Sequence, residues 1–261
     1  MATGAELLVL LPQVEALARR AGDLILAVYA SDFAVERKAD ASPVTLADEA
    51  AERLIVPALQ ALGPPWPVVA EEAHARGEAP EACPMFWLVD PLDGTREFVS
   101  RNGEFTVNIA LVQDELPVLG VVHVPVTDTL YAGVVGSGAW RVTPQGGRER
   151  IGCRTVPATG LAMACSRSHG DEAALARWQQ GRGVASRLAA GSSLKFGLLA
   201  AGDADVYPRF GRTMEWDTAA GHAVLRAAGG EVTDSAGQPL RYGKPGFENP
   251  DFIAWGARAG A

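Results

Sequence analysis

The sequence has few cysteines, few aromatic residues and no long apolar run. Three cysteines among 261 residues, with no CxxC pair, argue against a disulfide framework or a structural zinc site and favour a reducing compartment. No segment reaches the roughly 20 uninterrupted apolar residues that a membrane-spanning helix needs. The apolar start at 6–11 runs into Pro12 and two arginines, which favours an amphipathic helix over a signal segment. We therefore expect a soluble, cytoplasmic protein, with peripheral attachment at the inner membrane as the alternative.

An excess of basic residues is also absent. The chain has 23 lysines and arginines against 31 acidic residues, a net charge of −8, so a nucleic acid polymer is not an expected partner. Four scattered histidines, without HxH or HExxH spacing, do not predict a histidine metal site. The hydrophobic content of 48% is high enough for a sizeable core and excludes a disordered chain.

Hydrophobic periodicity divides the chain into two parts. Apolar residues at helical spacing predict helices over 5–30 and 46–62. Five short β-rich runs follow, at 85–89, 106–113, 118–123, 129–135 and 138–142, with a hairpin expected around Asp114–Glu115. Later, strands and helices alternate, with an extended segment expected at 204–207, which indicates an α/β layer. We expect an α/β protein of layered α+β type, with an N-terminal α+β subdomain over 1–145 and a C-terminal α/β subdomain over 146–261.

One segment, 87–95, combines the groups that metal chemistry requires. A buried-type strand delivers Asp90 at its end, and Asp93 follows three residues later with the Leu92 carbonyl between them. Two carboxylates and a main-chain oxygen at a strand end suit a hard cation such as Mg²⁺. Gly94 and Thr95 then open a helical turn, whose amides suit a phosphate group. The alternative is that both aspartates only cap a turn.

Three further acidic residues stand at element boundaries. Glu71 follows the short strand 68–70, Asp217 begins an apolar helix, and Asp48 lies three residues after Thr45. Each has a structural alternative: a solvated loop for Glu71, an N-cap for Asp217 and a capping box with Thr45 for Asp48.

The order and spacing of these segments resemble the magnesium-dependent, lithium-sensitive phosphatase superfamily that includes inositol monophosphatase and fructose-1,6-bisphosphatase. The signature is Asp90-Pro-Leu-Asp-Gly-Thr95, with a preceding glutamate and a later Trp216–Asp217 pair. Residues 96–98, 101–108, 191–196 and 207–211 are similar to its branch of CysQ-type 3′(2′),5′-bisphosphate nucleotidases. The resemblance covers nearly the whole chain and implies an α-β-α-β-α sandwich.

The resemblance also implies roles for individual residues. Two or three Mg²⁺ ions, displaced by inhibitory Li⁺, would be held by Glu71, Asp90, the Leu92 carbonyl, Asp93 and Asp217. Thr95 and Asp48 would orient and deprotonate the attacking water, a task that Glu71 shares in the inositol branch. The substrate would contact Gly94, Thr95, Ser193, Lys195, Arg209 and Asp217.

The substrate class follows from Arg209, which stands where inositol monophosphatases usually carry an acidic residue. A guanidinium suits a second phosphate group, and Lys195 and Arg212 could add positive charge to the same pocket. The expected partner is a small nucleotide bisphosphate, 3′-phosphoadenosine 5′-phosphate, with 3′-phosphoadenosine 5′-phosphosulfate as a second substrate. Structurally, Arg209 could instead form a surface salt bridge, and Lys195 could extend into solvent.

Two other functions remain open from the sequence. One is an inositol or sugar-phosphate monophosphatase of the same fold, and the other is a catalytically silent, metal-dependent binding module. The sequence is compatible with a monomer or a homodimer.

Overall fold

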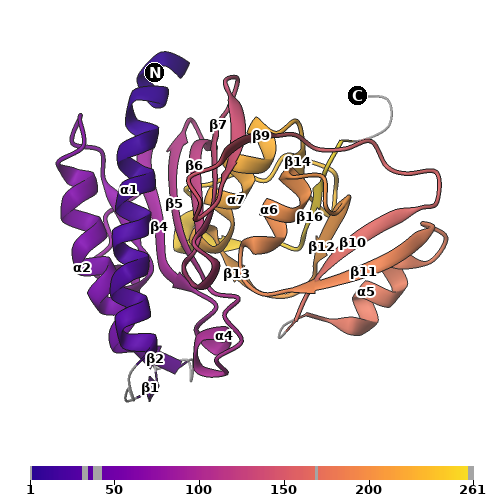
Figure 1. Ribbon diagram of the computed structural model, residues 1–261, viewed down its shortest axis with the longest axis horizontal. Coiled ribbons are helices and arrows are strands. Elements are labelled where there is room, and N and C mark those ends of the chain that lie inside the picture. The colour runs from indigo at the N-terminus through magenta and orange to yellow at the C-terminus, as the bar shows by residue number, and fades with distance from the viewer. Residues whose placement is uncertain (1, 31–34, 38–42, 168–169, 258–261) are drawn as a thin grey trace.

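The computed structural model describes residues 2–30, 35–37, 43–167 and 170–257, which form five layers (Figure 1). A seven-stranded sheet and a five-stranded sheet alternate with helical layers, which confirms the expected α-β-α-β-α sandwich. One face of the first sheet is covered by α1 (Gly4–Tyr29) and α2 (Leu46–Gln60). Between the sheets lie α6 (Leu194–Ala200) and α7 (Glu215–Ala227), and α5 (Glu172–Gln179) covers the outer face of the second sheet.

The seven-stranded sheet has the order β3-β4-β5-β6-β7-β8-β9, and only β3 and β4 are parallel. Its strands are β3 (Val68–Ala70), β4 (Met85–Asp93), β5 (Thr106–Gln113), β6 (Leu116–Val124), β7 (Thr129–Val134), β8 (Gly138–Val142) and β9 (Arg148–Ile151). The expected hairpin joins β5 to β6, where Asp114 and Glu115 both have positive φ, 50° and 65°. The sheet continues to Ile151, past residue 145, and the subdomain division at 145/146 stays a prediction.

The five-stranded sheet has the order β11-β10-β12-β16-β14 and mixes parallel and antiparallel pairs. Its strands are β10 (Leu161–Ser166), β11 (Val184–Ala190), β12 (Val206–Arg209), β14 (Glu231–Asp234) and β16 (Phe252–Trp255). Two-stranded pairs join β1 (Val35–Arg37) to β2 (Pro43–Thr45) and β13 (Thr213–Met214) to β15 (Glu248–Asn249). Short helices are α3 (Glu71–Ala75), α4 (Thr95–Val99), η1 (Pro125–Thr127) and η2 (Pro245–Phe247).

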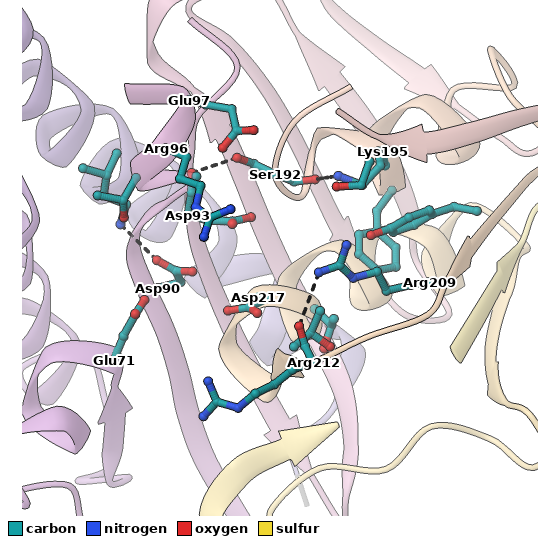
Figure 2. A pocket seen from close by; sticks show the side chains of 18 of the residues that line it. Glu71, Asp90, Asp93, Arg96, Glu97, Ser192, Lys195, Arg209, Arg212 and Asp217 are labelled. Carbon is teal, nitrogen blue, oxygen red and sulfur yellow. Dashed lines mark hydrogen bonds between the residues drawn. The ribbon is translucent and has the colours of Figure 1, made fainter. Parts of the chain in front are cut away.

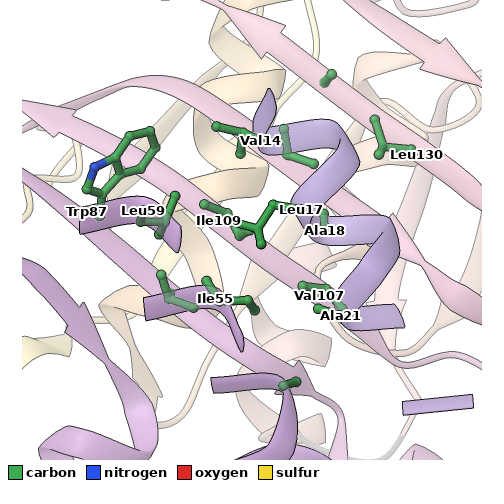
Figure 3. Close-up of a cluster of buried hydrophobic side chains, with 14 of the residues drawn as sticks. Val14, Leu17, Ala18, Ala21, Ile55, Leu59, Trp87, Val107, Ile109 and Leu130 are labelled. Atoms are coloured by element: carbon green, nitrogen blue, oxygen red, sulfur yellow. The ribbon is translucent and has the colours of Figure 1, made fainter. Parts of the chain in front are cut away.

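Apolar side chains at helical spacing explain why α1 and α2 lie flat on the first sheet. Figure 3 shows Val14 and Leu17 of α1 facing Ile109 of β5, with Ile55 of α2 beside them, and all four are fully or almost fully buried. Burying one such side chain contributes about 1.5–3 kcal/mol. No helix within the described residues is long and apolar enough to cross a membrane.

The opposite face of the first sheet packs against α7 at very short range. A Cβ added to Gly120 of β6 would lie 2.3 Å from the main-chain oxygen of Ala220, so only glycine allows this approach. This contact brings the start of α7, which carries Asp217, close to the end of β4.

The strand that carries the acidic motif is longer than expected. The sequence places its end at Val89, but β4 continues to Asp93 with a register shift between Asp90 and Asp93 opposite β5. Pro91 has no N–H to donate to β5, so the shift leaves it outside the regular pairing. Because of this register shift, the side chains of Asp90 and Asp93 do not follow the regular alternation between the two faces of the sheet.

Candidate active site

A cavity of about 220 Å³ lies between the two halves of the molecule. Its lining includes Glu71 from α3, Asp90 and Asp93 from β4, and Asp217 from α7. Figure 2 shows these four carboxylates on one side and two basic side chains, Lys195 and Arg209, on the other. The wall also contains a fifth carboxylate, Glu97, two further arginines, Arg96 and Arg212, and the residues Leu92, Gly94, Thr95, Ser192, Tyr207 and Thr218.

The two aspartates of β4 are held by different neighbours. Oδ1 of Asp90 accepts a hydrogen bond from the main-chain N–H of Leu92 at 3.1 Å. Oδ2 of Asp93 accepts from the Ser193 amide at 2.7 Å and from Asn108 Nδ2 at 3.2 Å. Asp93 is therefore fixed from both halves of the chain, whereas Asp90 is fixed within its own strand.

Gly94 is required by the turn between β4 and α4. Its φ is 89°, and a Cβ there would lie 2.1 Å from Oγ of Ser192. Thr95 is the first residue of α4, and both Gly94 and Thr95 line the cavity. Gly94 and Thr95 therefore border the same cavity as the carboxylates, and the phosphate-binding role of their amides stays a prediction.

Glu71 and Asp217 each lie in the first turn of a helix. Glu71 begins α3 directly after β3, and Asp217 is the third residue of α7, where its Oδ2 accepts from the Met214 amide at 2.8 Å. Behind them, His74 and Trp216 lie with ring centroids 5.1 Å apart. The alternative that Asp217 is the N-cap is wrong: Met214 is the N-cap residue of α7, and Asp217 accepts from its amide and also lines the cavity.

The cavity gathers like charges in a buried place. Burial, together with the negative charges of Glu71, Asp93, Asp217 and Asp48, raises the pKa of Asp90 well above its usual value. Burial and the charges of Asp93 and Glu71 likewise raise the pKa of Asp217. A cation placed among these carboxylates would stabilise their charged forms.

The donor set fits a hard divalent cation in its chemistry and charge. Carboxylate oxygens and the Leu92 carbonyl are the ligands that Mg²⁺ prefers. Within the described ranges, no three acidic, histidine or cysteine side chains are arranged closely enough to hold a metal ion as they stand. The fit is one of chemistry and electrostatics, and not of a closed cage.

Lys195 and Arg209 supply positive charge at the opposite wall. Lys195 is 3% exposed, and its Nζ donates to the main-chain oxygens of Ser192 at 2.6 Å and Ala190 at 3.2 Å. The alternative that this lysine extends into solvent is therefore wrong. Arg209 is 9% exposed, lines the same cavity and donates from Nη2 to the Arg212 oxygen at 3.3 Å.

Two expected site residues are buried beside the cavity and do not line it. Asp48 is fully buried in the first turn of α2, close enough for its charge to raise the pKa of Asp90. Ser193 donates from Oγ to the Asp217 main-chain oxygen at 2.5 Å and accepts from Asn108 at 2.9 Å. The side chain of Thr45, the partner in the expected capping box, lies outside the described residues. The roles of Asp48 and Ser193 stay predictions.

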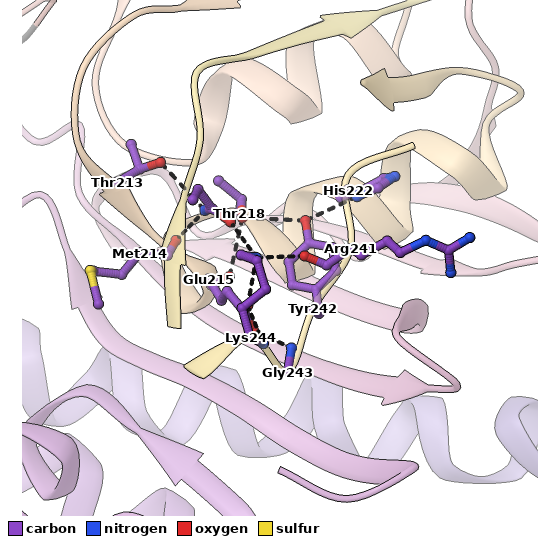
Figure 4. A network of polar contacts seen from close by, with 10 residues as sticks. Thr213, Met214, Glu215, Thr218, His222, Arg241, Tyr242, Gly243 and Lys244 are labelled. Atoms are coloured by element: carbon purple, nitrogen blue, oxygen red, sulfur yellow. Dashed lines mark hydrogen bonds and ion pairs between the residues drawn. The ribbon is translucent and has the colours of Figure 1, made fainter. Parts of the chain in front are cut away.

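The sequence analysis assigned no role to the polar network around Glu215, two residues before Asp217 (Figure 4). Glu215, fully buried, accepts from the Gly243 and Lys244 amides at 2.6 and 2.9 Å and from Lys244 Nζ at 2.6 Å. Asn249 Nδ2 donates to the Met214 oxygen at 2.7 Å. The partners of Glu215, Gly243 and Lys244, are distant in the sequence, so no local pattern indicated the network.

Known proteins are similar to this chain in sequence and in fold over nearly its whole length. The inositol monophosphatase family pattern matches residues 7–257. A protein of Escherichia coli K12 named 3′(2′),5′-bisphosphate nucleotidase CysQ is 48% identical over 246 residues, which cover 93% of this chain and 98% of that protein. A Salmonella typhimurium protein of the same name is 47% identical over 93% of this chain and 98% of its own.

Solved structures agree with these relatives. CysQ from Bacteroides thetaiotaomicron has a TM-score of 0.78 and 41% identity, covering 93% of this chain and 95% of that one. An IMPase of Thermotoga maritima has a TM-score of 0.76 and 27% identity, covering 94% and 91%. The chain belongs to the inositol monophosphatase family. Its resemblance to the CysQ-type branch, expected from residues 96–98, 101–108, 191–196 and 207–211, is confirmed.

Proposed function

We propose that the chain is a 3′(2′),5′-bisphosphate nucleotidase that hydrolyses the 3′-phosphate of 3′-phosphoadenosine 5′-phosphate to AMP and phosphate. One relationship supports this assignment: four carboxylates and two basic side chains face each other across one cavity. The relatives named CysQ support the same substrate class. The sulfated analogue, 3′-phosphoadenosine 5′-phosphosulfate, is the second expected substrate, with adenosine 5′-phosphosulfate as its product.

The acidic wall is the proposed place of reaction. Two or three Mg²⁺ ions would be held by Glu71, Asp90, the Leu92 carbonyl, Asp93 and Asp217. When bound, magnesium supplies positive charge that lowers the pKa of water and neutralises phosphate oxygens. Lithium inhibits by taking one of these positions.

The residues of the chain then orient the reactants. The amides of Gly94 and Thr95 hold the scissile phosphate at the start of α4. Thr95 orients the attacking water, and Asp48, buried behind Asp90, accepts its proton directly or through Thr95, with Glu71 sharing this task. No covalent intermediate on a serine or cysteine is required.

The basic wall is the proposed place of the second phosphate. Arg209 offers a planar guanidinium that binds a phosphate through two parallel N–H groups, and Lys195 adds a charge. Both lie across the cavity from Asp90 and Asp93 (Figure 2), so one ligand can reach both walls. An inositol monophosphate offers these cations no second phosphate.

The test is phosphate release in Mg²⁺ from 3′-phosphoadenosine 5′-phosphate and inositol 1-phosphate, measured side by side. We expect a strong preference for the nucleotide, loss of activity in EDTA with recovery on added Mg²⁺, and inhibition by Li⁺. A preference for inositol 1-phosphate would keep the acidic wall as the reaction centre and refute the assignment of the basic wall.

A further inference from the structure

Glu104 joins three segments that are distant in the sequence. This residue lies between α4 and β5, and its carboxylate accepts from Nε and Nη2 of Arg167, after β10, at 2.8 and 2.7 Å. The same carboxylate accepts from the Gly191 amide at 2.7 Å, and Arg167 Nη2 also donates to the Ala189 oxygen at 3.0 Å. The hydrogen bonds of Arg167 lower the pKa of Glu104, so the pair is fully charged at neutral pH.

The loop 191–193, between β11 and α6, is shaped to fit this junction. Ser192 adopts a left-handed conformation with φ 49°, and its Oγ lies 2.9 and 2.8 Å from the main-chain oxygens of Asp93 and Glu104, which share its single hydroxyl proton. A Cβ on Gly191 would lie 2.7 Å from the Glu104 oxygen, which leaves room only for glycine. A left-handed serine persists where its surroundings hold it in place.

Two groups of the active site depend on the position of this loop. The Ser193 amide donates to Oδ2 of Asp93 at 2.7 Å, and the Ser192 carbonyl accepts from Lys195 Nζ at 2.6 Å. The first contact orients a carboxylate of the acidic wall. The second fixes the ammonium group of the basic wall.

We propose that the Glu104–Arg167 pair is a positioning clamp that sets the spacing between the two walls of the cavity. Neither Glu104 nor Arg167 lines the cavity, so the pair acts through the loop 191–193 and does not contact substrate. The inference rests on the proposed function, because it concerns the distance between the site of reaction and the second phosphate. An exposed ion pair with no such role would contribute little to stability and nothing to selectivity.

The test compares Arg167→Gln and Glu104→Gln with the wild type, with Arg167→Lys as the conservative variant. Arg141→Gln is the matched control: it breaks the ion pairs of Arg141 with Glu149 at 2.8 Å and with Asp203 at 3.7 Å, and Arg141 does not line the cavity. The measurements are amide hydrogen exchange at Ser193, the melting temperature, and kcat and KM for the bisphosphate and for inositol 1-phosphate.

Loss of the Glu104–Arg167 pair is expected to change the distance between the two walls of the cavity more than the stability of the fold. Because displacements near 1 Å cost up to about a hundredfold in rate, we expect kcat/KM for the bisphosphate to fall about tenfold or more in Arg167→Gln, with a smaller loss for the monophosphate. The Ser193 amide should exchange about tenfold faster, since its bond to Asp93 then opens locally. In both kcat/KM and the Ser193 exchange rate, Arg167→Lys should lie between the wild type and Arg167→Gln, and Arg141→Gln should equal the wild type.

Two outcomes would overturn the clamp. One is an unchanged Ser193 exchange rate, and the other is an equal loss on both substrates that follows the melting temperature. If the wild type itself prefers inositol 1-phosphate, the proposed function fails. The exchange rate of Ser193 then still decides whether Glu104 and Arg167 position the loop.

Discussion

Oε2 of Glu52 accepts a hydrogen bond from the main-chain N–H of Glu72 at 2.8 Å, so a side chain of α2 caps the first turn of α3. Oε1 of the same carboxylate accepts from Arg76 Nη2 at 3.0 Å. Glu52 lies one turn after Asp48 on the buried face of α2. Glu52 therefore connects α2, which carries Asp48, to the first turn of α3, which begins with Glu71.

Glu52→Ala is expected to lower both stability and activity. The change leaves the Glu72 amide and the Arg76 guanidinium without this buried acceptor, which costs about 1–3 kcal/mol in the free energy of unfolding. Activity should fall as well, because the first turn of α3 sets the position of Glu71. Urea unfolding and initial rates measure the two effects.

The control for this prediction is Glu49→Ala in the same helix. Glu49 pairs with Arg53 at 3.0 Å on the exposed side of α2, so its removal should change stability by no more than about 0.5 kcal/mol. A Glu52→Ala variant that is destabilised but retains full kcat would show that Glu71 does not depend on this cap.

Asp93→Asn is expected to abolish activity and spare the fold. Burial raises the pKa of Asp93, so removing its charge relieves a cost in the folded state and should leave the unfolding free energy unchanged or higher. Loss of several kcal/mol of charge stabilisation should lower kcat at least about a hundredfold. Phosphate release and the rise in melting temperature on adding Mg²⁺ are the measurements.

Asp114→Asn is the matched control for the aspartate variant. Asp114 lies in the β5–β6 turn with a φ of 50°, a conformation that asparagine also adopts readily. Its activity and its Mg²⁺-dependent melting should equal those of the wild type. Retention of the Mg²⁺ effect in Asp93→Asn would remove Asp93 from the proposed ligands.

Local patterns predicted those parts of the fold that depend on neighbours in the sequence. The limits of β5 and β8 were predicted correctly, at 106–113 and 138–142, because the apolar runs there end at turn residues. The predicted end of β4, at Val89, was wrong, because the path of the strand past Pro91 depends on its pairing with β5. Similarly, β12 is shifted towards Arg209, which pairs with Phe252 of β16 far along the chain.

The same distinction applies to the site. Asp90 and Asp93 could be found from one short motif, because the residues that carry the chemistry are adjacent. The burial of Lys195 could not, because it depends on the Ser192 carbonyl and on the Tyr207 ring, whose centroid lies 5.0 Å from Nζ. The junction of Glu104 with Arg167 spans 63 residues and leaves no local signal.

Arg209→Glu is expected to change substrate preference. A negative charge at this wall repels the second phosphate, so KM for 3′-phosphoadenosine 5′-phosphate should rise at least about tenfold, in line with the loss of a charge-assisted hydrogen bond. Hydrolysis of inositol 1-phosphate should change much less. The control is Arg187→Glu on β11, which does not line the cavity. Equal losses on both substrates would refute the second-phosphate pocket.

Binding of the bisphosphate is expected to weaken as pH rises through about 8. Burial, and then the charge of Arg209, lower the pKa of Lys195 from 10.5 to about 8, although Asp93 opposes the shift. Lys195 is therefore protonated and positively charged below about pH 8 and neutral above it. Because the buried charge is unfavourable in the folded state, the free energy of unfolding should rise between pH 8 and 10.5, where only the unfolded chain still carries this charge. KM for the bisphosphate, divided by KM for inositol 1-phosphate at each pH, should increase across the transition. Lys195→Arg should abolish the increase, because a guanidinium stays charged in this range; a ratio that is flat in the wild type would exclude Lys195 from the pocket.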